Sequence, residues 1–222
     1  LGARSADVAR SASTSTSAAL VRPVAEAEAA WNGDAHGRAA RLRMCHATSE
    51  RLVDLARGLY LITGGLGGLG LRAAVGLALG GTPGILLASR GGRAACDGQG
   101  LEEVWLRWQG AVSAAVACDS ATSTDASALV GVRTATGVLH AAGAGDEGLL
   151  CKVQARRVRW MHAPKALGSW RLGCSAVGAP PEAQALFSSV GSGLGNAGQA
   201  NYAAGSGCLD ARTVSVLSLI HI

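Results

Sequence analysis

Short apolar runs alternate with longer segments of helical pattern from residue 59 to residue 211. The apolar runs span four to six residues and usually pass into glycine or polar residues, as buried strands of a parallel sheet do. The segments between them carry Leu, Ala or Val three and four positions apart, which is typical of helices packed on one face. We therefore predict strands at 59–63, 85–88, 112–117, 137–141 and 185–188, and helices at 71–79, 101–108, 154–170 and 200–211.

Strands that alternate with helices are joined by right-handed crossovers, which make the strands parallel and place helices on both faces of the sheet. We expect a Rossmann-like, doubly wound α/β fold over residues 58–212, truncated at its C-terminal end. Only 4% of the residues are aromatic although 49% are hydrophobic. Small apolar side chains must therefore form the core, which suits a parallel sheet covered by helices.

The two ends of the chain lack this pattern. Residues 1–57 contain a Ser/Thr/Ala tract and an Ala-rich stretch, and a helix at 23–30 would have no clear apolar face. We expect a linker or an incomplete flanking region there. Residues 213–222 suggest a sixth strand. The last six residues also match the translation of a common transposon library adapter, so we expect this end to be truncated and partly artefactual.

Composition and charge argue against several classes of function. The net charge is +5, but no basic stripe is interleaved with aromatic residues, so we expect no nucleic-acid partner. The six cysteines stand singly, without metal-ligand or disulfide spacing, and we expect no metal. Free thiols suit a reducing compartment, the cytoplasm or a plastid. No apolar stretch is long enough to cross a membrane, and we expect no membrane partner.

A glycine-rich motif, Gly65-Leu66-Gly67-Gly68-Leu69-Gly70, follows the first predicted strand and opens the first predicted helix. Glycines in this position let the backbone approach a pyrophosphate, which then lies at the N-terminus of the helix. We interpret the motif as a dinucleotide site. A purely structural glycine turn is the alternative.

The residues after the second strand indicate which dinucleotide is bound. NAD sites generally place an Asp or Glu there to hold the ribose 2′-hydroxyl. This chain instead has Ser89-Arg90 and no acid. Because a guanidinium pairs with a 2′-phosphate, we predict NADPH. The alternative for Arg90 is an exposed loop arginine.

A serine and a tyrosine flank a second glycine-rich segment. Ser189 directly follows the fifth predicted strand, and Tyr202 lies thirteen residues later in the last predicted helix. Reduction of a carbonyl requires a proton donor, and a phenol needs a nearby ammonium to lower its pKa from about 10. The chain has only two lysines. Lys165, in the helix before Ser189, is the expected partner, and Lys152 is expected to be a solvated charge.

Four segments together resemble one family. They are 61–70, 140–143, 163–170 and 195–205, and they are similar to the ketoreductase domain of modular polyketide synthases, a relative of the ketoreductase of animal fatty acid synthase. The resemblance covers about residues 58–211. It implies a member of the short-chain dehydrogenases/reductases that uses NADPH to reduce a β-ketoacyl thioester on an acyl carrier protein, within a multidomain synthase.

The resemblance also implies roles for the side chains of the site. Tyr202 would protonate the ketone oxygen, Ser189 would hydrogen-bond it, and Lys165 would hold the nicotinamide ribose and keep the pKa of Tyr202 low. Ser206 stands where the family has an asparagine that relays protons, and its shorter reach puts activity in doubt. A structural remnant without turnover and a stand-alone short-chain carbonyl reductase are therefore the alternatives.

The family's cofactor contacts extend well beyond the glycine motif. Asp119 matches a position that contacts adenine, although a helix N-cap would look the same in the sequence. The implied cofactor-binding residues are Thr63, Gly64, Gly65, Leu66, Gly67, Gly68, Leu69, Gly70, Ser89, Arg90, Cys118, Asp119, Ala141, Ala142, Gly143, Lys165 and Tyr202.

Four further positions bear on the stereochemistry of the product and on the identity of a catalytic base. Asp146 and Glu147 match two residues of the Leu-Asp-Asp motif of D-type ketoreductases, and Asn201 also fits that type. This favours a D-hydroxyl product, with solvated loop acids as the alternative. His140 ends an apolar strand, and we expect it to be a packed histidine rather than a catalytic base.

Overall fold

A five-stranded parallel sheet forms the centre of the domain. The computed structural model describes residues 58–94, 100–131 and 135–220, with side chains up to residue 215. All neighbouring strands pair in parallel, in the order β3-β2-β1-β4-β5. The strands are β1 (Leu59–Thr63), β2 (Gly84–Ser89), β3 (Ala114–Ala117), β4 (Gly137–His140) and β5 (Ala183–Leu186). The strand order reverses between β1 and β4, which is where doubly wound sheets bind ligands.

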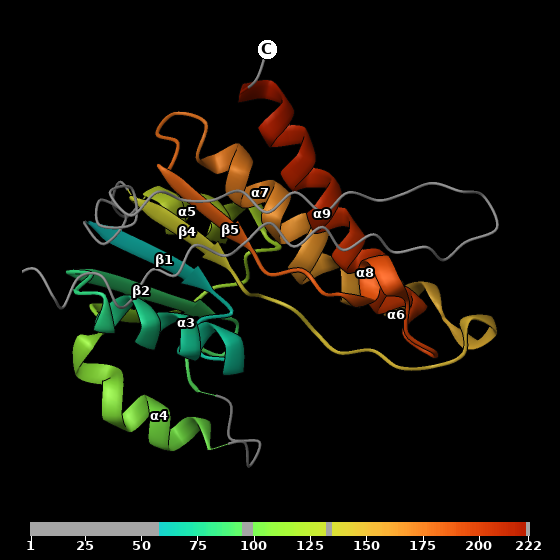
Figure 1. The fold of residues 1–222 in the computed structure, drawn as a ribbon, viewed down its shortest axis with the longest axis horizontal. Coiled ribbons are helices and arrows are strands. Elements are labelled where there is room, and N and C mark those ends of the chain that lie inside the picture. Colours follow the sequence, from blue (N-terminus) through green and yellow to red (C-terminus); the bar gives the residue numbers. More distant parts are fainter. Residues whose placement is uncertain (1–57, 95–99, 132–134, 221–222) are drawn as a thin grey trace, which may run out of the picture. The chain divides into compact units, whose positions relative to one another are not determined.

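Helices cover both faces of this sheet (Figure 1). One face carries α3 and α4, and the other carries α5, α7 and α9. The α-helices are α3 (Gly68–Leu79), α4 (Leu101–Trp108), α5 (Ser123–Gly131), α6 (Ala155–His162), α7 (Gly168–Ser175), α8 (Gly191–Leu194) and α9 (Ala200–Ile220). Shorter turns are η1 (Gln109–Ala111), η2 (Leu150–Lys152) and η3 (Ala163–Leu167), of which η3 is a π-helix. The predicted doubly wound fold is confirmed.

Alternation along the strands creates two hydrophobic cores. Successive strand side chains point to opposite faces, so Leu61 of β1 packs with α5 and α7, while Ile62 packs with α3. Both side chains are fully buried. The cores hold the sheet rigidly between its helices, and the carboxyl ends of the strands are left to form a site.

The helix predicted at 154–170 is interrupted by η3. Pro164 has no N–H to donate within a regular α-helix, and its ring would collide with the preceding turn. The π-helix accommodates it: Gly168 N–H bonds to the carbonyl of Ala163, five residues back. The helical run then continues through α7 to Ser175, beyond the predicted end.

Two further differences concern helices. The sixth strand suggested for 213–222 is wrong, because α9 continues to Ile220. No glycine or proline ends the helix after residue 211, and the hydroxyl of Thr213 bonds to the carbonyl of Leu209 one turn earlier. Helix α5 was not predicted, because its sequence is short and only Ala126 and Leu129 are buried. The linker predicted at 1–57 and the helix considered at 23–30 lie outside the described residues.

Candidate active site

The glycine motif forms a tight loop between β1 and α3. Gly65 N–H donates to the carbonyl of Ala88 at the end of β2, at 3.0 Å, which holds the loop against the sheet. A Cβ on Gly70 would lie 2.6 Å from the Cα of Gly65, and one on Gly64 would lie 2.6 Å from the backbone of Ala141. Gly64 also has a positive φ of 66°. These close approaches require glycine.

An open cleft of about 680 Å³ lies at the carboxyl edge of the sheet. The predicted cofactor residues line it, except Gly65 and Gly70, whose backbones pack under the loop. The ends of all five strands, or the loops that follow them, therefore contribute to one site. Lining residues that were not predicted are Arg72, Gly91, Arg93, Ser120, Ala144, Gly145, Pro164, Phe187 and Ser188. Most directly adjoin predicted positions; Arg72 comes from α3 and Pro164 from η3.

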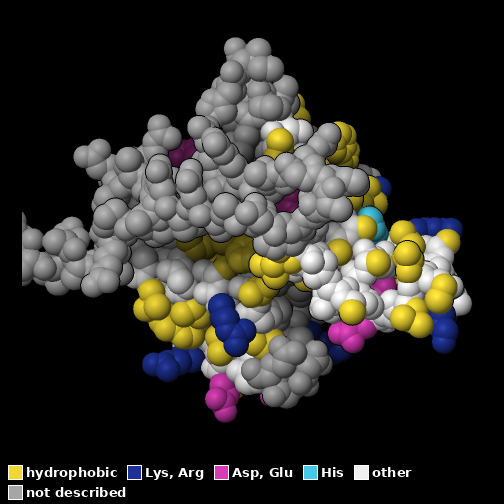
Figure 2. All heavy atoms as spheres, turned by 45° about the vertical axis from the view of Figure 1, so that its right-hand side comes forward, with side chains coloured by type: hydrophobic (Ala, Val, Ile, Leu, Met, Phe, Trp, Pro, Cys, Tyr) yellow, Lys and Arg dark blue, Asp and Glu magenta, His cyan; other side chains and the backbone are white. Residues whose placement is uncertain are grey.

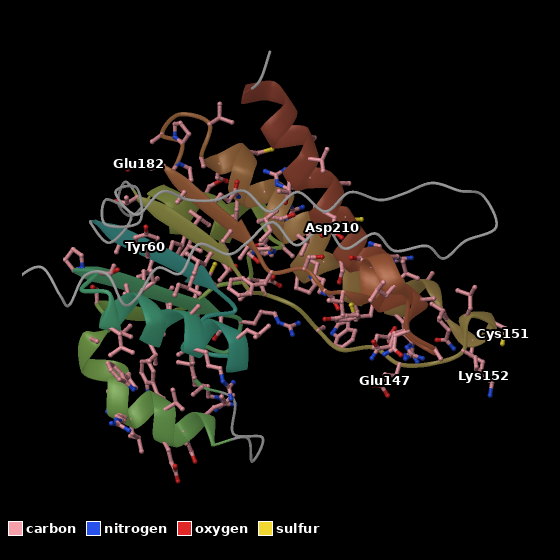
Figure 3. The ribbon with its side chains drawn as sticks, viewed as in Figure 1. Tyr60, Glu147, Cys151, Lys152, Glu182 and Asp210 are labelled. Carbon is pink, nitrogen blue, oxygen red and sulfur yellow. The ribbon has the colours of Figure 1, made fainter. Side chains whose placement is uncertain are left out.

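Lys165 is buried inside the site, with only 3% of the residue exposed. Its Nζ donates to the hydroxyl of Ser206 at 2.6 Å and lies 3.7 Å from the centre of the Tyr202 ring. Lys152, by contrast, is exposed. Figure 3 shows Lys152 beside Cys151 at the outer end of the segment after β4, with both side chains pointing outward. The structure thus brings Lys165, and not Lys152, to the predicted tyrosine.

The surroundings of Tyr202 make its phenol more acidic. Burial alone raises the pKa of Tyr202, but the Ser189 hydroxyl, the Lys165 ammonium and the Ser206 hydroxyl lower it, and the balance lies below the usual value. The Ser189 hydroxyl also accepts the Gly191 N–H at 3.2 Å, which fixes it in the turn after β5. The hydroxyl of Ser189 therefore lies next to the phenol of Tyr202, although only Tyr202 of this pair lines the cleft.

Ser206 is fully buried one helical turn after Tyr202. Its hydroxyl donates to the Tyr202 carbonyl at 3.1 Å and accepts the bond from Lys165. The single proton of this hydroxyl is thus engaged with the backbone of α9. A serine has no second donor to offer.

His140 is buried at the end of β4 and connects three elements. Its Nδ1 lies 2.6 Å from the hydroxyl of Thr63, and its Nε2 lies 3.3 Å from the carbonyl of Lys165. A carbonyl can only accept, so Nε2 carries the hydrogen and Nδ1 accepts from Thr63. Burial lowers the pKa of His140 to about 4, although its backbone partners oppose this. The expectation of a packed histidine is confirmed.

Cys118, Asp119 and Ser120, which follow β3, line one part of the cleft. The carboxylate of Asp119 accepts the Ala121 N–H at 3.0 Å, while the hydroxyl of Thr122 accepts the Asp125 N–H at the start of α5. Thr122, and not Asp119, is therefore the residue that caps this helix. The pKa of the neighbouring Cys118 thiol is raised to about 11, mainly by burial and further by the negative charges of Asp125 and Asp119, so this thiol stays protonated.

Asp146 is buried and lies at the centre of a polar network, which rules out the solvated alternative for this residue. Its carboxylate pairs with the guanidinium of Arg157 and accepts the side-chain amide of Asn201 at 2.7 Å. The hydrogen bond from the Asn201 amide lowers the pKa of Asp146 most, and the hydrogen bond from Arg157 has the next largest effect. Because Asn201 directly precedes Tyr202, this network ties the loop after β4 to the start of α9. Glu147 is exposed.

Other parts of the described structure bear on partners. Over the described residues, no three His, Cys, Asp or Glu side chains gather as a metal site would require. Within the same ranges no helix is long and apolar enough to span a membrane. On the face shown in Figure 2, the Lys and Arg side chains stand at separate places and do not form a stripe.

Comparison with known proteins decides the family. The model of the KR domain matches residues 58–216. The chain belongs to the KR domain family. This confirms the ketoreductase resemblance and places the chain among the oxidoreductases of the short-chain dehydrogenase/reductase superfamily.

The relatives of this KR domain are parts of much longer proteins. The chain is 40% identical over 161 residues to the spectinabilin polyketide synthase system protein NorB of Streptomyces orinoci, covering 69% of the chain and 7% of that protein. It is 36% identical over 162 residues to a mycocerosic acid synthase-like polyketide synthase of Mycobacterium tuberculosis, covering 70% and 8%. The chain thus spans less than a tenth of these curated relatives.

Solved ketoreductases share its fold. The first ketoreductase of the tylosin PKS is 33% identical with a TM-score of 0.61, covering 70% of this chain and 34% of that one. A-type ketoreductases from a modular polyketide synthase are 29% identical with a TM-score of 0.65, covering 74% and 36%. A short-chain dehydrogenase/reductase from Vibrio parahaemolyticus, 20% identical with a TM-score of 0.59 and covering 71% and 68%, supports the fold alone.

Proposed function

We propose that this KR domain uses NADPH to reduce the β-ketone of an acyl thioester carried by an acyl carrier protein, giving the β-hydroxyacyl thioester. One observation carries the proposal. Lys165 and Tyr202 line the cleft that the glycine loop also lines, with Nζ of Lys165 3.7 Å from the centre of the Tyr202 ring and 2.6 Å from the hydroxyl of the buried Ser206. Its relatives are polyketide synthases, in which a carrier protein and neighbouring domains would be the partners.

The shape of the cleft fits a dinucleotide. Side chains at Gly64 or Gly70 would collide with backbone, so these glycines keep the loop tight against β4 and α3 at the edge of the cleft. Helix α3 has no acid in its first turn, and its free N–H groups therefore favour a pyrophosphate. When bound, the nicotinamide supplies a hydride to the carbonyl carbon.

The side chains of this chain would handle the proton. Tyr202 would donate its phenolic proton to the ketone oxygen, and the Ser189 hydroxyl would hydrogen-bond the same oxygen as negative charge develops. Lys165 would stabilise the phenolate that remains. The lowered pKa of Tyr202 supports this role, because a more acidic phenol transfers its proton more readily.

NADPH is favoured over NADH by the residues after β2. Ser89 and Arg90 line the cleft there, and no acid follows β2 through Ala94. A carboxylate would repel a 2′-phosphate, whereas a guanidinium binds it.

The network of Asp146 and Asn201 beside the cleft supports the D-hydroxyl product. The cytoplasm, where reduced NADPH and reduced thiols coexist, is the proposed location.

A second candidate is a catalytically weak or inactive domain of the same architecture. Ser206 favours it, because its hydroxyl has one proton to share between the carbonyl and the phenol of Tyr202 and offers no second donor for a relay. A stand-alone reductase of small carbonyls has less support, since the curated relatives are far longer proteins.

Turnover of a β-ketothioester model substrate by the full chain distinguishes these candidates. The proposal expects oxidation of NADPH that depends on the thioester, and formation of the β-hydroxy product. Tight NADPH binding without turnover would establish the second candidate instead. In that case we expect Ser206→Asn, which adds a free amide donor, to increase kcat.

A further inference from the structure

The turn after β5 carries Ser189, but little apolar packing holds this turn in place. Within it α8 spans only four residues, and no side chain caps the helix. The side chains of Val190 and Leu194 are 80% and 66% exposed, and the buried residue of α8 is Gly191, which has no side chain. Polar contacts must therefore fix the position of the Ser189 hydroxyl.

Two serine hydroxyls, one on each side of Ser189, connect this turn to α9. The Ser188 hydroxyl donates to the carbonyl of Ser206 at 3.2 Å. The Ser192 hydroxyl lies 2.6 Å from Oδ2 of Asp210, a carboxylate that can only accept, and 2.7 Å from the carbonyl of Ser189. The single hydrogen of the Ser192 hydroxyl is thus shared between α9 and the backbone of Ser189.

Asp210 lies on the same face of α9 as the phenol of the site. Tyr202, Ser206 and Asp210 are spaced four residues apart, so their side chains follow one another along one side of the helix. The neighbouring Leu209 is fully buried, which anchors this turn of α9 in the domain. One helix therefore carries both the phenol and the carboxylate that holds the turn of Ser189.

The direction of the Ser189 hydroxyl follows from this arrangement. Its oxygen accepts the Gly191 N–H at 3.2 Å, and the Ser192 N–H donates to the carbonyl of Ser189 at 3.0 Å, which closes the turn. With its oxygen bonded to the backbone, the hydroxyl has its hydrogen free to donate to the phenol of Tyr202. Burial raises the pKa of Tyr202, and the bond from Ser189 is the largest effect that lowers it.

We propose that Asp210 is a positioning residue of the site, which acts through Ser192 to hold the Ser189 hydroxyl against the phenol of Tyr202. This inference rests on the proposed function and adds to it a residue that does not itself line the cleft. Loss of the carboxylate releases the Ser192 hydroxyl, and the turn then no longer fixes the direction in which Ser189 donates.

Ultraviolet difference titration of the tyrosines tests this contact without any turnover. The chain has two tyrosines. Burial, followed by the negative charge of Glu182, raises the pKa of Tyr60, whereas the pKa of Tyr202 is lowered, so Tyr202 ionises first as the pH rises. Tyr202→Phe removes the first transition and thereby assigns it.

We expect Ser192→Ala and Asp210→Ala to move the ionisation of Tyr202 to higher pH. In both variants the phenolate loses the hydrogen bond from Ser189. Asp210→Asn keeps an acceptor for the Ser192 hydroxyl and should move the ionisation less. The direct effect of charge has the opposite sign, since loss of a negative charge would move the ionisation to lower pH. Glu182→Gln removes the same charge from an exposed residue before β5, and should affect the second transition alone (Figure 3).

Kinetics with a β-ketothioester test the consequence for the reaction. Asp210→Ala should lower kcat roughly 5-fold, the effect of one ordinary hydrogen bond, with the NADPH Kd unchanged within about 2-fold. In a chain that already carries Ser189→Ala, the same substitution should have almost no further effect, because it acts through Ser189. Asp210 is exposed and alanine favours helix more than aspartate does, so the variant leaves no cavity and keeps α9 intact.

The outcomes separate this inference from the proposed function. If the unaltered chain shows no turnover, the proposed reaction is wrong, and the titration still decides whether Asp210 acts on Tyr202. An unchanged or lower pH of ionisation in Ser192→Ala would overturn the inference. An equal loss of kcat from Asp210→Ala with and without Ser189→Ala would also overturn it, because the carboxylate would then act independently of the hydroxyl.

Discussion

Lys165 and Tyr202 lie close enough for the charge of one to change the acidity of the other. The Nζ of Lys165 is 3.7 Å from the centre of the Tyr202 ring, and Ser206 holds it there. Desolvation opposes ionisation of the phenol, but the hydroxyl of Ser189 and the ammonium of Lys165 outweigh it. At the residue scale, the site is a phenol whose surroundings lower its pKa.

Replacing Tyr202 with phenylalanine removes the proton donor and leaves the ring. We expect kcat to fall by about 10²-fold or more, the usual contribution of a general acid, with the NADPH Kd unchanged within about 2-fold. Kinetics with a β-ketothioester and fluorescence titration measure the two quantities. Tyr60→Phe, near the start of β1 and away from the cleft, is the control (Figure 3). Full activity in Tyr202→Phe would refute the mechanism.

At the scale of elements, glycines decide how closely α3 approaches β1. Gly70 packs directly on the backbone of Gly64 and Gly65, so the first turn of α3 touches the end of β1. Gly76 lies on the same helix with open space around the place of a Cβ. The two glycines therefore have different physical roles within one element.

Alanine substitution at these two glycines should have opposite effects. Gly70→Ala forces the helix away from the loop, and we expect it to lower the free energy of unfolding by about 1–3 kcal/mol and to weaken NADPH binding. Gly76→Ala should raise the free energy of unfolding by about 0.5–1 kcal/mol, because alanine favours helix. Denaturant unfolding measures both. A harmless Gly70→Ala would contradict the close packing of α3.

At the scale of the whole domain, His140 joins parts that are distant in the sequence. Thr63 at the end of β1 donates to it, and it donates to Lys165 in η3. The ring therefore connects two central strands to the helix that carries the lysine of the site. Its burial also couples the stability of the domain to pH.

The stability of the domain should fall as the pH drops from about 6.5 to about 4. The pKa of His140 is about 4 when folded, below the usual 6.5, so the unfolded chain binds the extra proton between these values. The stabilisation is complete above pH 6.5. The contribution of neutral His140 to the free energy of unfolding then decreases towards pH 4, by about 3 kcal/mol.

Denaturant unfolding across this range, compared with His140→Gln, isolates the contribution of the histidine. The variant should be less stable at pH 7, and its stability should depend less on pH over the same range. Identical pH dependence in both proteins would show that His140 is not buried in its neutral form.

The sequence by itself determined the fold class and most of the cleft. Apolar runs that pass into glycine indicated the strands, and motifs at strand ends predicted residues that line one cavity, because parallel strands end at a common edge. It missed α5, whose apolar positions are few, and it suggested a strand where α9 continues. Both errors arose where tertiary packing outweighs local pattern.

Only the tertiary structure decided how particular side chains meet. No spacing in the sequence shows that Ser206 uses its hydroxyl proton on the backbone of α9, or that Asp146 is enclosed by Arg157 and Asn201. The same holds for Arg72 and Arg93, which reach the cleft from different elements. These relations depend on the packing of helices and turns around the sheet, which brings together residues that are far apart along the chain.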